Sequence, residues 1–142
     1  MFSKIIYNFI LLPILYFIIL LGGLFSRKVR KGFAGRLKSK KILKSFINKS
    51  KNDSKEIFWF HAASLGEYEQ IKPVLSGLKE IEPNSYFILS LFSPSGYDFI
   101  DDEQVDCKVY LPFDFYWGVK SCLKIVKPKK IILAGYDVWP NL

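Results

Sequence analysis

The chain has 142 residues, of which half are hydrophobic and 17% aromatic, and its formal net charge is +8 at pH 7. The charge is uneven: residues 1–51 hold twelve Lys or Arg and no acid, whereas residues 52–142 hold nine Lys and thirteen acids. A basic segment outside the folded body does not indicate a nucleic-acid-binding domain. A single histidine excludes a multi-histidine metal site. Cys107 and Cys122 match no metal-binding spacing, so we expect two buried, reduced thiols.

The chain begins with an uncharged apolar stretch that runs from Ile5 to Phe25. A helix of this length spans roughly 30 Å, the hydrocarbon thickness of a bilayer. The stretch is too long for the apolar core of a usual signal peptide, and no small-residue cleavage site clearly follows it. We therefore predict an uncleaved membrane-anchor or transmembrane helix over residues 1–26, which Pro13 could kink or make re-entrant.

A basic juxtamembrane segment and linker is predicted over residues 27–55. The cations that we expect to contact the anionic membrane surface are Arg27, Lys28, Arg30, Lys31 and Arg36. Because Lys and Arg accumulate on the cytoplasmic side of a membrane helix, they predict that the rest of the chain is cytoplasmic. Leu43, Phe46 and Ile47 stand at helical spacing, so two interpretations stay open. One is an amphipathic helix on the membrane, the other a solvated flank that only sets topology, and the two are compatible.

From Glu56 onward, short apolar runs alternate with helical patterns. Strands are predicted at 57–60, 86–92, 108–111 and 131–134, and helices at 68–81 and 116–126, with a short helix before residues 101–103. This alternation predicts right-handed βαβ units and a parallel sheet, so residues 56–142 are expected to form a Rossmann-like α/β domain. No helical pattern follows the last strand. We therefore expect an incomplete outer layer and the N-terminal part of a longer protein.

The turn after the first predicted strand, His61-Ala62-Ala63-Ser64-Leu65-Gly66-Glu67, is the first candidate site. Ser64-x-x-Glu67 before a helix is a capping box, and local pattern alone favours that structural role. The alternative is that Glu67 is a catalytic base at the carboxyl end of a strand, where open α/β sheets bind ligands. Ser64 and the small Gly66 would then contact a substrate, although Gly66 also suits a tight turn.

Two further loops end strands at the same predicted edge. The hydroxyls and backbone N–H groups of Ser93, Ser95 and Gly96 could hold a phosphate or a sugar, or Ser93 could simply cap a helix. Asp137 lies beside Trp139, which suits a sugar face or plain packing. His61 is more often a core histidine than a site residue. Neither nucleotide fingerprint, the Walker loop nor GxGxxG, is present.

Five motifs in order resemble the family of Kdo transferases, bacterial enzymes that add 3-deoxy-D-manno-octulosonic acid (Kdo) to the lipid A precursor. The first is the His61–Glu67 turn with Lys72-Pro73. The others are Ser93-Pro94-Ser95-Gly96, Tyr110-Leu111-Pro112-Phe113-Asp114, Asp137-Val138-Trp139-Pro140-Asn141, and the basic segment Arg30-Lys31-Gly32 with Arg36-Leu37. Together they extend over essentially the whole chain.

The resemblance implies the N-terminal, acceptor-binding half of a GT-B glycosyltransferase in lipopolysaccharide biosynthesis. It implies an inverting, metal-independent transfer without a cofactor, with the donor CMP-Kdo bound by a C-terminal domain. Glu67 would match the family's general base, and Asp137 an acid that assists at the transition state. Two departures concern Asp137: Asp stands where Glu is usual, and Gly135 stands where the family usually has a second acid.

The partners implied are the lipid A precursor and the anionic face of the bacterial cytoplasmic (inner) membrane, with the catalytic domain on the cytoplasmic side. Because the donor domain is not visible, residues 1–142 alone are expected to bind acceptor at most and not to turn over. Two alternatives remain: a non-catalytic, membrane-anchored binding module with a Rossmann-like fold, and a flavodoxin-like nucleotide binder, which would need a fifth strand.

Overall fold

Four parallel strands form the central sheet of the computed structural model, which describes residues 2–50, 53–135 and 139–142. They are β1 (Ile57–Ala62), β2 (Tyr86–Leu91), β3 (Cys107–Tyr110) and β4 (Lys130–Leu133), in the order β3-β2-β1-β4. Every neighbouring pair is parallel. The predicted α/β class and parallel sheet are confirmed. The first strand extends two residues beyond its predicted end and so carries His61 into the sheet.

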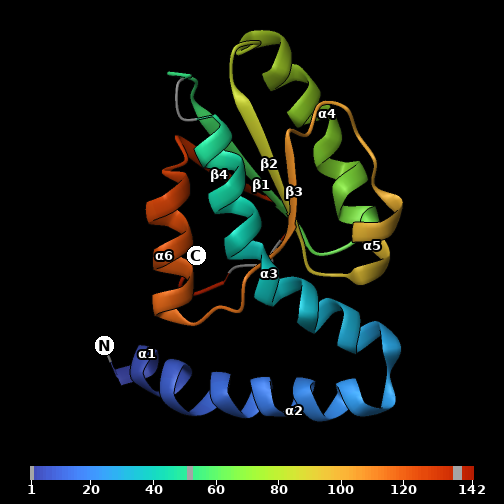
Figure 1. Cartoon of the computed structure of the whole chain (residues 1–142), viewed down its shortest axis with the longest axis vertical. Coiled ribbons are helices and arrows are strands. Elements are labelled where there is room, and N and C mark those ends of the chain that lie inside the picture. Colours follow the sequence, from blue (N-terminus) through green and yellow to red (C-terminus); the bar gives the residue numbers. More distant parts are fainter. Residues whose placement is uncertain (1, 51–52, 136–138) are drawn as a thin grey trace.

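Helices cover both faces of this sheet (Figure 1). On one face lie α4 (Leu65–Ile81) and α5 (Pro94–Phe99), whose apolar side chains pack with Phe58 and Phe60 of β1. On the other face lie α3 (Arg27–Lys49) and α6 (Tyr116–Val126), packed with Trp59 of β1. Successive β1 residues therefore serve opposite layers, as the period of two in a strand requires. Burial of β1 and β2 on both faces explains their nearly continuous apolar sequence.

Helix α3 corrects the sequence-based interpretation of the basic segment. Leu43 is fully buried among Trp59, Ile88 and Val109, and Phe46 packs against the same cluster. The apolar stripe of this helix therefore faces the sheet, which neither the membrane-lying helix nor the solvated flank anticipated. On this face of the sheet α3 lies beside α6. The helical layer there is therefore completed by a segment that precedes β1. Structurally the domain begins in α3 and not at residue 56.

Glycine makes the close approach of α3 possible. A Cβ on Gly35 would lie 2.3 Å from two ring carbons of Tyr110, and one on Gly32 would lie 3.0 Å from Pro94. Beside this contact the Ser39 hydroxyl donates to the backbone carbonyl of Tyr110 at 2.8 Å. These residues fix α3 against the ends of β3 and β2.

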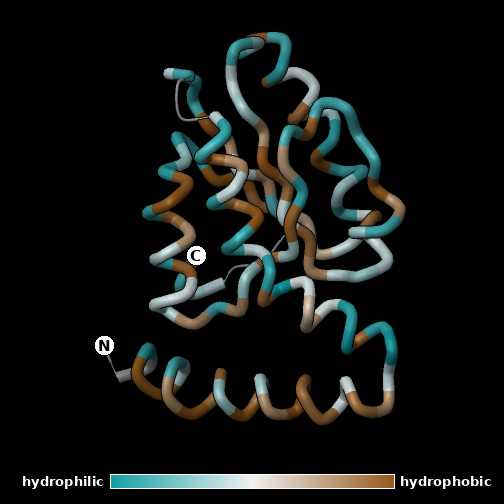
Figure 2. The backbone as a smooth tube through the Cα atoms, in the orientation of Figure 1, coloured by the Kyte–Doolittle hydropathy of each residue, from teal (hydrophilic) through white to brown (hydrophobic). Residues whose placement is uncertain are grey.

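The apolar N-terminal stretch is helical throughout its described length, as α1 (Phe2–Ile6), η1 (Tyr7–Leu11) and α2 (Leu12–Phe25). Figure 2 shows this rod as the most continuously hydrophobic part of the chain. By length and composition, Lys4–Phe25 could cross a membrane, and this fits the predicted anchor. The π-helical turn lies just before Pro13, which has no N–H to donate and crowds the preceding turn.

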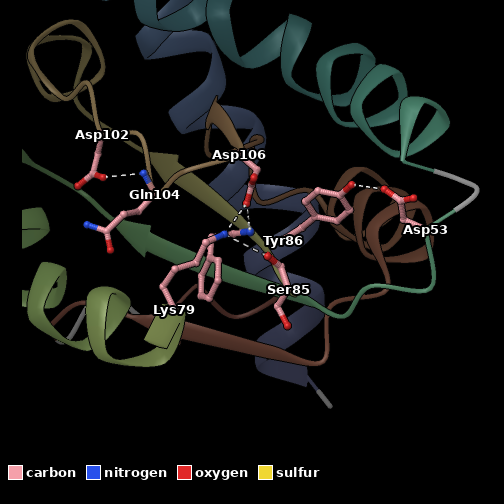
Figure 3. Close-up of polar contacts among 8 residues, drawn as sticks. Asp53, Lys79, Ser85, Tyr86, Asp102, Gln104 and Asp106 are labelled. Atoms are coloured by element: carbon pink, nitrogen blue, oxygen red, sulfur yellow. Dashed lines mark hydrogen bonds and ion pairs between the residues drawn. The ribbon is translucent and has the colours of Figure 1, made fainter. Parts of the chain in front are cut away.

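The amino-terminal ends of the strands carry a set of mutually paired polar groups (Figure 3). Asp106 accepts from the backbone N–H of Phe87 at 2.7 Å and lies 3.4 Å from the Lys79 ammonium. The Tyr86 hydroxyl donates to Asp53, and Lys129 pairs with Glu56. Ion pairs and hydrogen bonds among neighbouring residues thus stabilise this edge of the sheet.

Both cysteines are buried free thiols, as predicted. Burial, and to a lesser degree the charge of Asp106, raises the pKa of the Cys107 thiol to about 11. The described part of the chain contains no group of three or more His, Cys, Asp or Glu side chains arranged to hold a metal ion.

Candidate active site

Glu67 lies in the turn between β1 and α4 and closes a cap there. Ser64 is the N-cap residue with extended backbone, and its hydroxyl accepts from the Glu67 N–H at 3.3 Å. The Glu67 carboxylate accepts from the Ala63 N–H at 2.6 Å. The capping prediction is therefore confirmed, with the return bond shifted by one residue from the usual capping box. The carboxylate is held half-buried at the carboxyl edge of the sheet.

Gly66 stands beside this carboxylate, and nothing in the described structure requires a glycine there. A Cβ added to Gly66 would meet no atom within 4 Å, and its φ is not in the left-handed region. Gly96 differs, because its Cβ would lie 3.2 Å from the Leu65 nitrogen. Packing thus accounts for Gly96, whereas the open space over Gly66 leaves room for a ligand close to the backbone.

The second predicted loop adjoins the first. The Ser93 N–H donates to the Ala63 carbonyl at 2.8 Å, and the hydroxyls of Ser93 and Ser95 lie 2.8 Å apart. Ser93 occupies the N-cap position of α5, but its side chain makes no capping bond. The structure therefore brings Ser64, Glu67, Ser93 and Ser95 together at one edge, as the order of the parallel strands required.

Arg36 is positioned differently from the other predicted membrane contacts. Its side chain is buried, its guanidinium donates to the Phe92 carbonyl at 2.7 Å, and it lies 4.2 Å from the centroid of the Phe92 ring. Burial lowers the pKa of this guanidinium. Arg36 was predicted to contact the membrane surface, but its buried guanidinium instead holds the loop after β2.

The remaining cations line an open groove of about 770 Å³ between the first turns of α3 and the start of α5. Its walls include Arg27, Lys28, Arg30, Lys31, Ala34, Pro94, Ser95, Asp98 and Phe99. Lys31 pairs with Asp98 at 2.6 Å. Among the residues described, Arg27, Lys28 and Arg30 have no carboxylate partner, so this groove is suited to an anion. Ser95 lines this groove, and its hydroxyl contacts that of Ser93, whose N–H is bonded to Ala63 at the start of the Glu67 turn.

Asp137 falls outside the described residues, so its predicted role stays a prediction. The chain next to it does return to the same edge: the Trp139 ring stacks on Phe92 with centroids 5.5 Å apart and an interplanar angle of 22°. Phe92 thus contacts both the Arg36 guanidinium and the Trp139 indole. Sequence reasoning missed this stack. The signal was an aromatic residue directly after β2 together with a tryptophan beyond β4.

Asp114 is a second residue that sequence reasoning left without a role. It is almost fully buried, and its carboxylate accepts from the Tyr7 hydroxyl at 2.8 Å and from the Asn141 N–H at 3.2 Å. Burial raises the pKa of the Asp114 carboxyl, and these hydrogen bonds oppose that shift. Asp114 and Asn141 end two of the motifs noted above. Their contact shows that these motifs meet in space.

His61 has the core role that sequence reasoning favoured. It is fully buried in β1, and its Nδ1 lies 3.0 Å from both the carbonyl and the hydroxyl of Ser90 in β2. The Trp59 indole donates to the same hydroxyl at 2.8 Å. These contacts tie the ends of β1 and β2 together below the Glu67 turn.

Three relatives show what the chain is similar to. A 3-deoxy-D-manno-octulosonic acid transferase of Aquifex aeolicus is 33% identical over 104 residues, which is 71% of this chain and 29% of that protein. A bifunctional glycosyltransferase/methyltransferase of Fusobacterium nucleatum is 27% identical over 72% of this chain and 18% of its own length. A 3-deoxy-D-manno-octulosonic acid transferase of Haemophilus influenzae is 29% identical over 59% of this chain and 20% of its own length.

The chain therefore spans well under half the length of these relatives. The family model described as 3-deoxy-D-manno-octulosonic-acid transferase (kdotransferase) matches residues 31–142. The match begins within α3, in agreement with the packing of that helix on the sheet. It covers most of the chain, and the chain accordingly belongs to the Kdo transferase family, to whose N-terminal domain it corresponds.

Proposed function

We propose that this chain is the acceptor-binding part of an inverting glycosyltransferase that moves Kdo from CMP-Kdo to the lipid A precursor. The transfer needs no metal ion and no cofactor, and CMP-Kdo binds to a further, C-terminal domain. Membership of the Kdo transferase family supports the reaction class. One structural observation carries the assignment to this edge: the Glu67 carboxylate lies beside open space over Gly66.

In the proposed step, the acceptor hydroxyl oxygen attacks the anomeric carbon of Kdo. The bond between that carbon and the phosphate oxygen of CMP breaks, and the electron pair leaves with CMP. Glu67 accepts the hydroxyl proton as the new glycosidic bond forms. Asp137 assists at the transition state. Attack from the face opposite CMP inverts the anomeric configuration.

Ser64, Gly66, Ser93, Ser95 and Gly96 are proposed to contact the acceptor sugar. The hydroxyl pair of Ser93 and Ser95 supports this, because it lies between the Glu67 turn and the cationic groove. The groove would receive the negative charges of the lipid precursor, and Arg27, Lys28, Arg30 and Lys31 supply cations there. Residues 1–142 on their own are expected to bind acceptor without transferring Kdo.

The proposed location is the cytoplasmic face of the bacterial inner membrane. The apolar rod and the cations next to it support an anchor at an anionic surface. This location would put a lipid acceptor and the Glu67 edge in the same layer.

A non-catalytic binding module is the second candidate, because the Glu67 carboxylate already has a structural role in the cap. The two functions differ in what Glu67→Gln does to the full-length protein supplied with CMP-Kdo and lipid A precursor. The amide keeps an acceptor oxygen for the cap but cannot take a proton. We expect kcat to fall by roughly 10²- to 10⁴-fold while acceptor binding is kept.

Glu69→Gln is the matched control, since Glu69 is an exposed carboxylate two residues further along α4. It should leave kcat unchanged. Kdo transfer by Glu67→Gln at the parent rate would remove Glu67 from the mechanism. Absence of any Kdo transfer by the unaltered full-length protein would favour the binding module.

A further inference from the structure

The apolar rod, residues 2–25, turns one particular stripe toward the folded domain. Asn8, Leu12, Tyr16, Ile19 and Gly23 follow one another at intervals of three or four residues, and all are at least partly buried. The remaining large apolar side chains, among them Phe17, Ile18, Leu21 and Leu24, are exposed. The rod therefore has an inner face and an outer face, although almost every residue in it is apolar.

The three polar residues of the apolar stretch all contact the domain. The Tyr7 hydroxyl donates to Asp114 at 2.8 Å. The Asn8 side-chain oxygen accepts from the Asn141 amide at 2.8 Å and from the Tyr116 N–H at 3.3 Å.

Tyr16 lies among three aromatic rings, with centroids 5.2 Å from Phe33, 5.1 Å from Phe113 and 5.7 Å from Phe115. An amide or hydroxyl without a partner in hydrocarbon costs several kcal/mol, and here the Tyr7 hydroxyl and the Asn8 amide are paired with the domain.

The corner between α2 and α3 keeps the rod against the carboxyl edge of the sheet. Ser26 is extended, its N–H donates to the Gly22 carbonyl at 2.9 Å, and its hydroxyl accepts from the Val29 N–H at 3.4 Å. Gly22 and Gly23 meet Val29 and Arg30 across this corner. As Figure 1 shows, the rod then runs along the bottom of the domain, below the ends of the strands.

We propose that residues 2–25 lie in the plane of the membrane surface and do not cross the bilayer. The outer face enters the acyl region of an anionic leaflet, and the domain takes the place of the polar face that an in-plane helix normally carries. The distribution of charge supports an anionic membrane as the surface that covers the outer face. Lys4 stands at one end of the rod and Arg27 and Lys28 at the other, so all three would meet the same anionic headgroup layer. A spanning helix would carry Lys4 to the opposite side.

The consequence is a fixed distance between membrane and site. With the rod in the interface, the carboxyl edge that carries Glu67 and the cationic groove faces the headgroups. Both ends of the rod are then cytoplasmic. This inference does not depend on the proposed reaction, and its test uses no activity.

The first test labels the full-length protein in spheroplasts of a Gram-negative host with a membrane-impermeant maleimide. Lys4→Cys should react only after permeabilisation, like the control Lys120→Cys on the exposed surface of α6. The parent protein, whose thiols at 107 and 122 are buried, gives the blank. Labelling of Lys4→Cys in intact spheroplasts would show that the rod spans the bilayer and would overturn the inference.

The second test asks whether the inner face stays docked in native membranes. Asn8→Cys with Asn141→Cys should be joined by mild oxidation, because the two amide side chains are hydrogen-bonded to each other. Phe17→Cys with Asn141→Cys is the control and should not be joined, because Phe17 lies on the outer face. Equal cross-linking of both pairs, or of neither, would contradict the docked arrangement.

The third test identifies what covers the outer face. An environment-sensitive fluorophore on Phe17→Cys should report hydrocarbon when the protein is reconstituted with phosphatidylglycerol vesicles. Its emission should be quenched by a lipid carrying a quencher in the acyl chain. Emission that lipid quenchers do not affect would mean that water or a second copy of the chain meets this face, and the membrane would be the wrong occupant.

Discussion

The two edges of the sheet are built by different physical means. At the amino edge, Asp106, Lys79, Lys129 and Glu56 pair with one another, as Figure 3 shows for the first two. At the carboxyl edge, glycines and stacked rings bring the segments together, and the cations of the first turn of α3 face a groove. Paired charges at one edge contribute to stability. Unpaired charges at the other are available for a ligand, so mutations at the two edges should have separable effects.

After Glu67→Gln, the largest effect is expected from the cations of the groove. Changing Arg27, Lys28 and Arg30 together to Gln should raise the KM of the full-length protein for the proposed lipid acceptor. At about 1 kcal/mol for each cation near an anionic surface, the rise is roughly 100-fold at low salt. Stability should not change, because none of the three pairs with a carboxylate among the described residues.

The matched control changes Lys40, Lys41 and Lys44 to Gln. These residues are also exposed, but they lie in the second half of α3, the part of the helix that packs over the sheet (Figure 1). Their replacement should alter the KM far less. Equal effects of the two triplets would show that the cations act only through net charge. The groove would then bind the acceptor no more specifically than the rest of the basic segment.

Local patterns predicted most of the elements because they depend on neighbouring residues. The turn Ser64–Glu67 was recognisable as a cap, and α6 begins and ends at the predicted residues. The surface against which α3 packs was not predictable in the same way. Its stripe, with Leu43 and Phe46, has the same periodicity whether it faces a bilayer or a sheet. Only Gly32 and Gly35 indicated that another segment packs closely against this helix, and a glycine does not identify which segment that is.

The candidate site was predictable where strand order alone brings residues together. Ser64, Glu67, Ser93 and Ser95 follow parallel strands and therefore share an edge. The contacts of Arg36 were not predictable, because the sequence shows that an arginine is present but not which groups its guanidinium contacts. The pairing of Tyr7 with Asp114 joins residues 107 positions apart, and nothing in either local sequence indicates the other.

Close packing at the carboxyl edge gives the next largest effect. Gly35→Ala would place a Cβ 2.3 Å from the Tyr110 ring, so α3 or the ring must move. We expect a loss of roughly 1–3 kcal/mol in the free energy of unfolding, measured by urea denaturation of the full-length protein. Gly77→Ala is the control, because a Cβ there meets no atom within 4 Å in the middle of α4. It should stabilise by about 0.5–1 kcal/mol. Equal outcomes for the two glycines would mean that Gly35 does not seat the helix.

The smallest effect compares one ion pair from each edge. Asp106→Ala removes the acceptor of the Phe87 N–H and the partner of Lys79, and should cost about 1–2 kcal/mol of stability without changing the KM for acceptor. Asp98→Ala removes the partner of Lys31, a largely exposed pair, and should cost about 0–1 kcal/mol. Because it frees a fourth cation in the groove, Asp98→Ala should lower the KM for the anionic acceptor. If it raises the KM instead, the ion pair positions Lys31 for binding, and charge alone does not describe the groove.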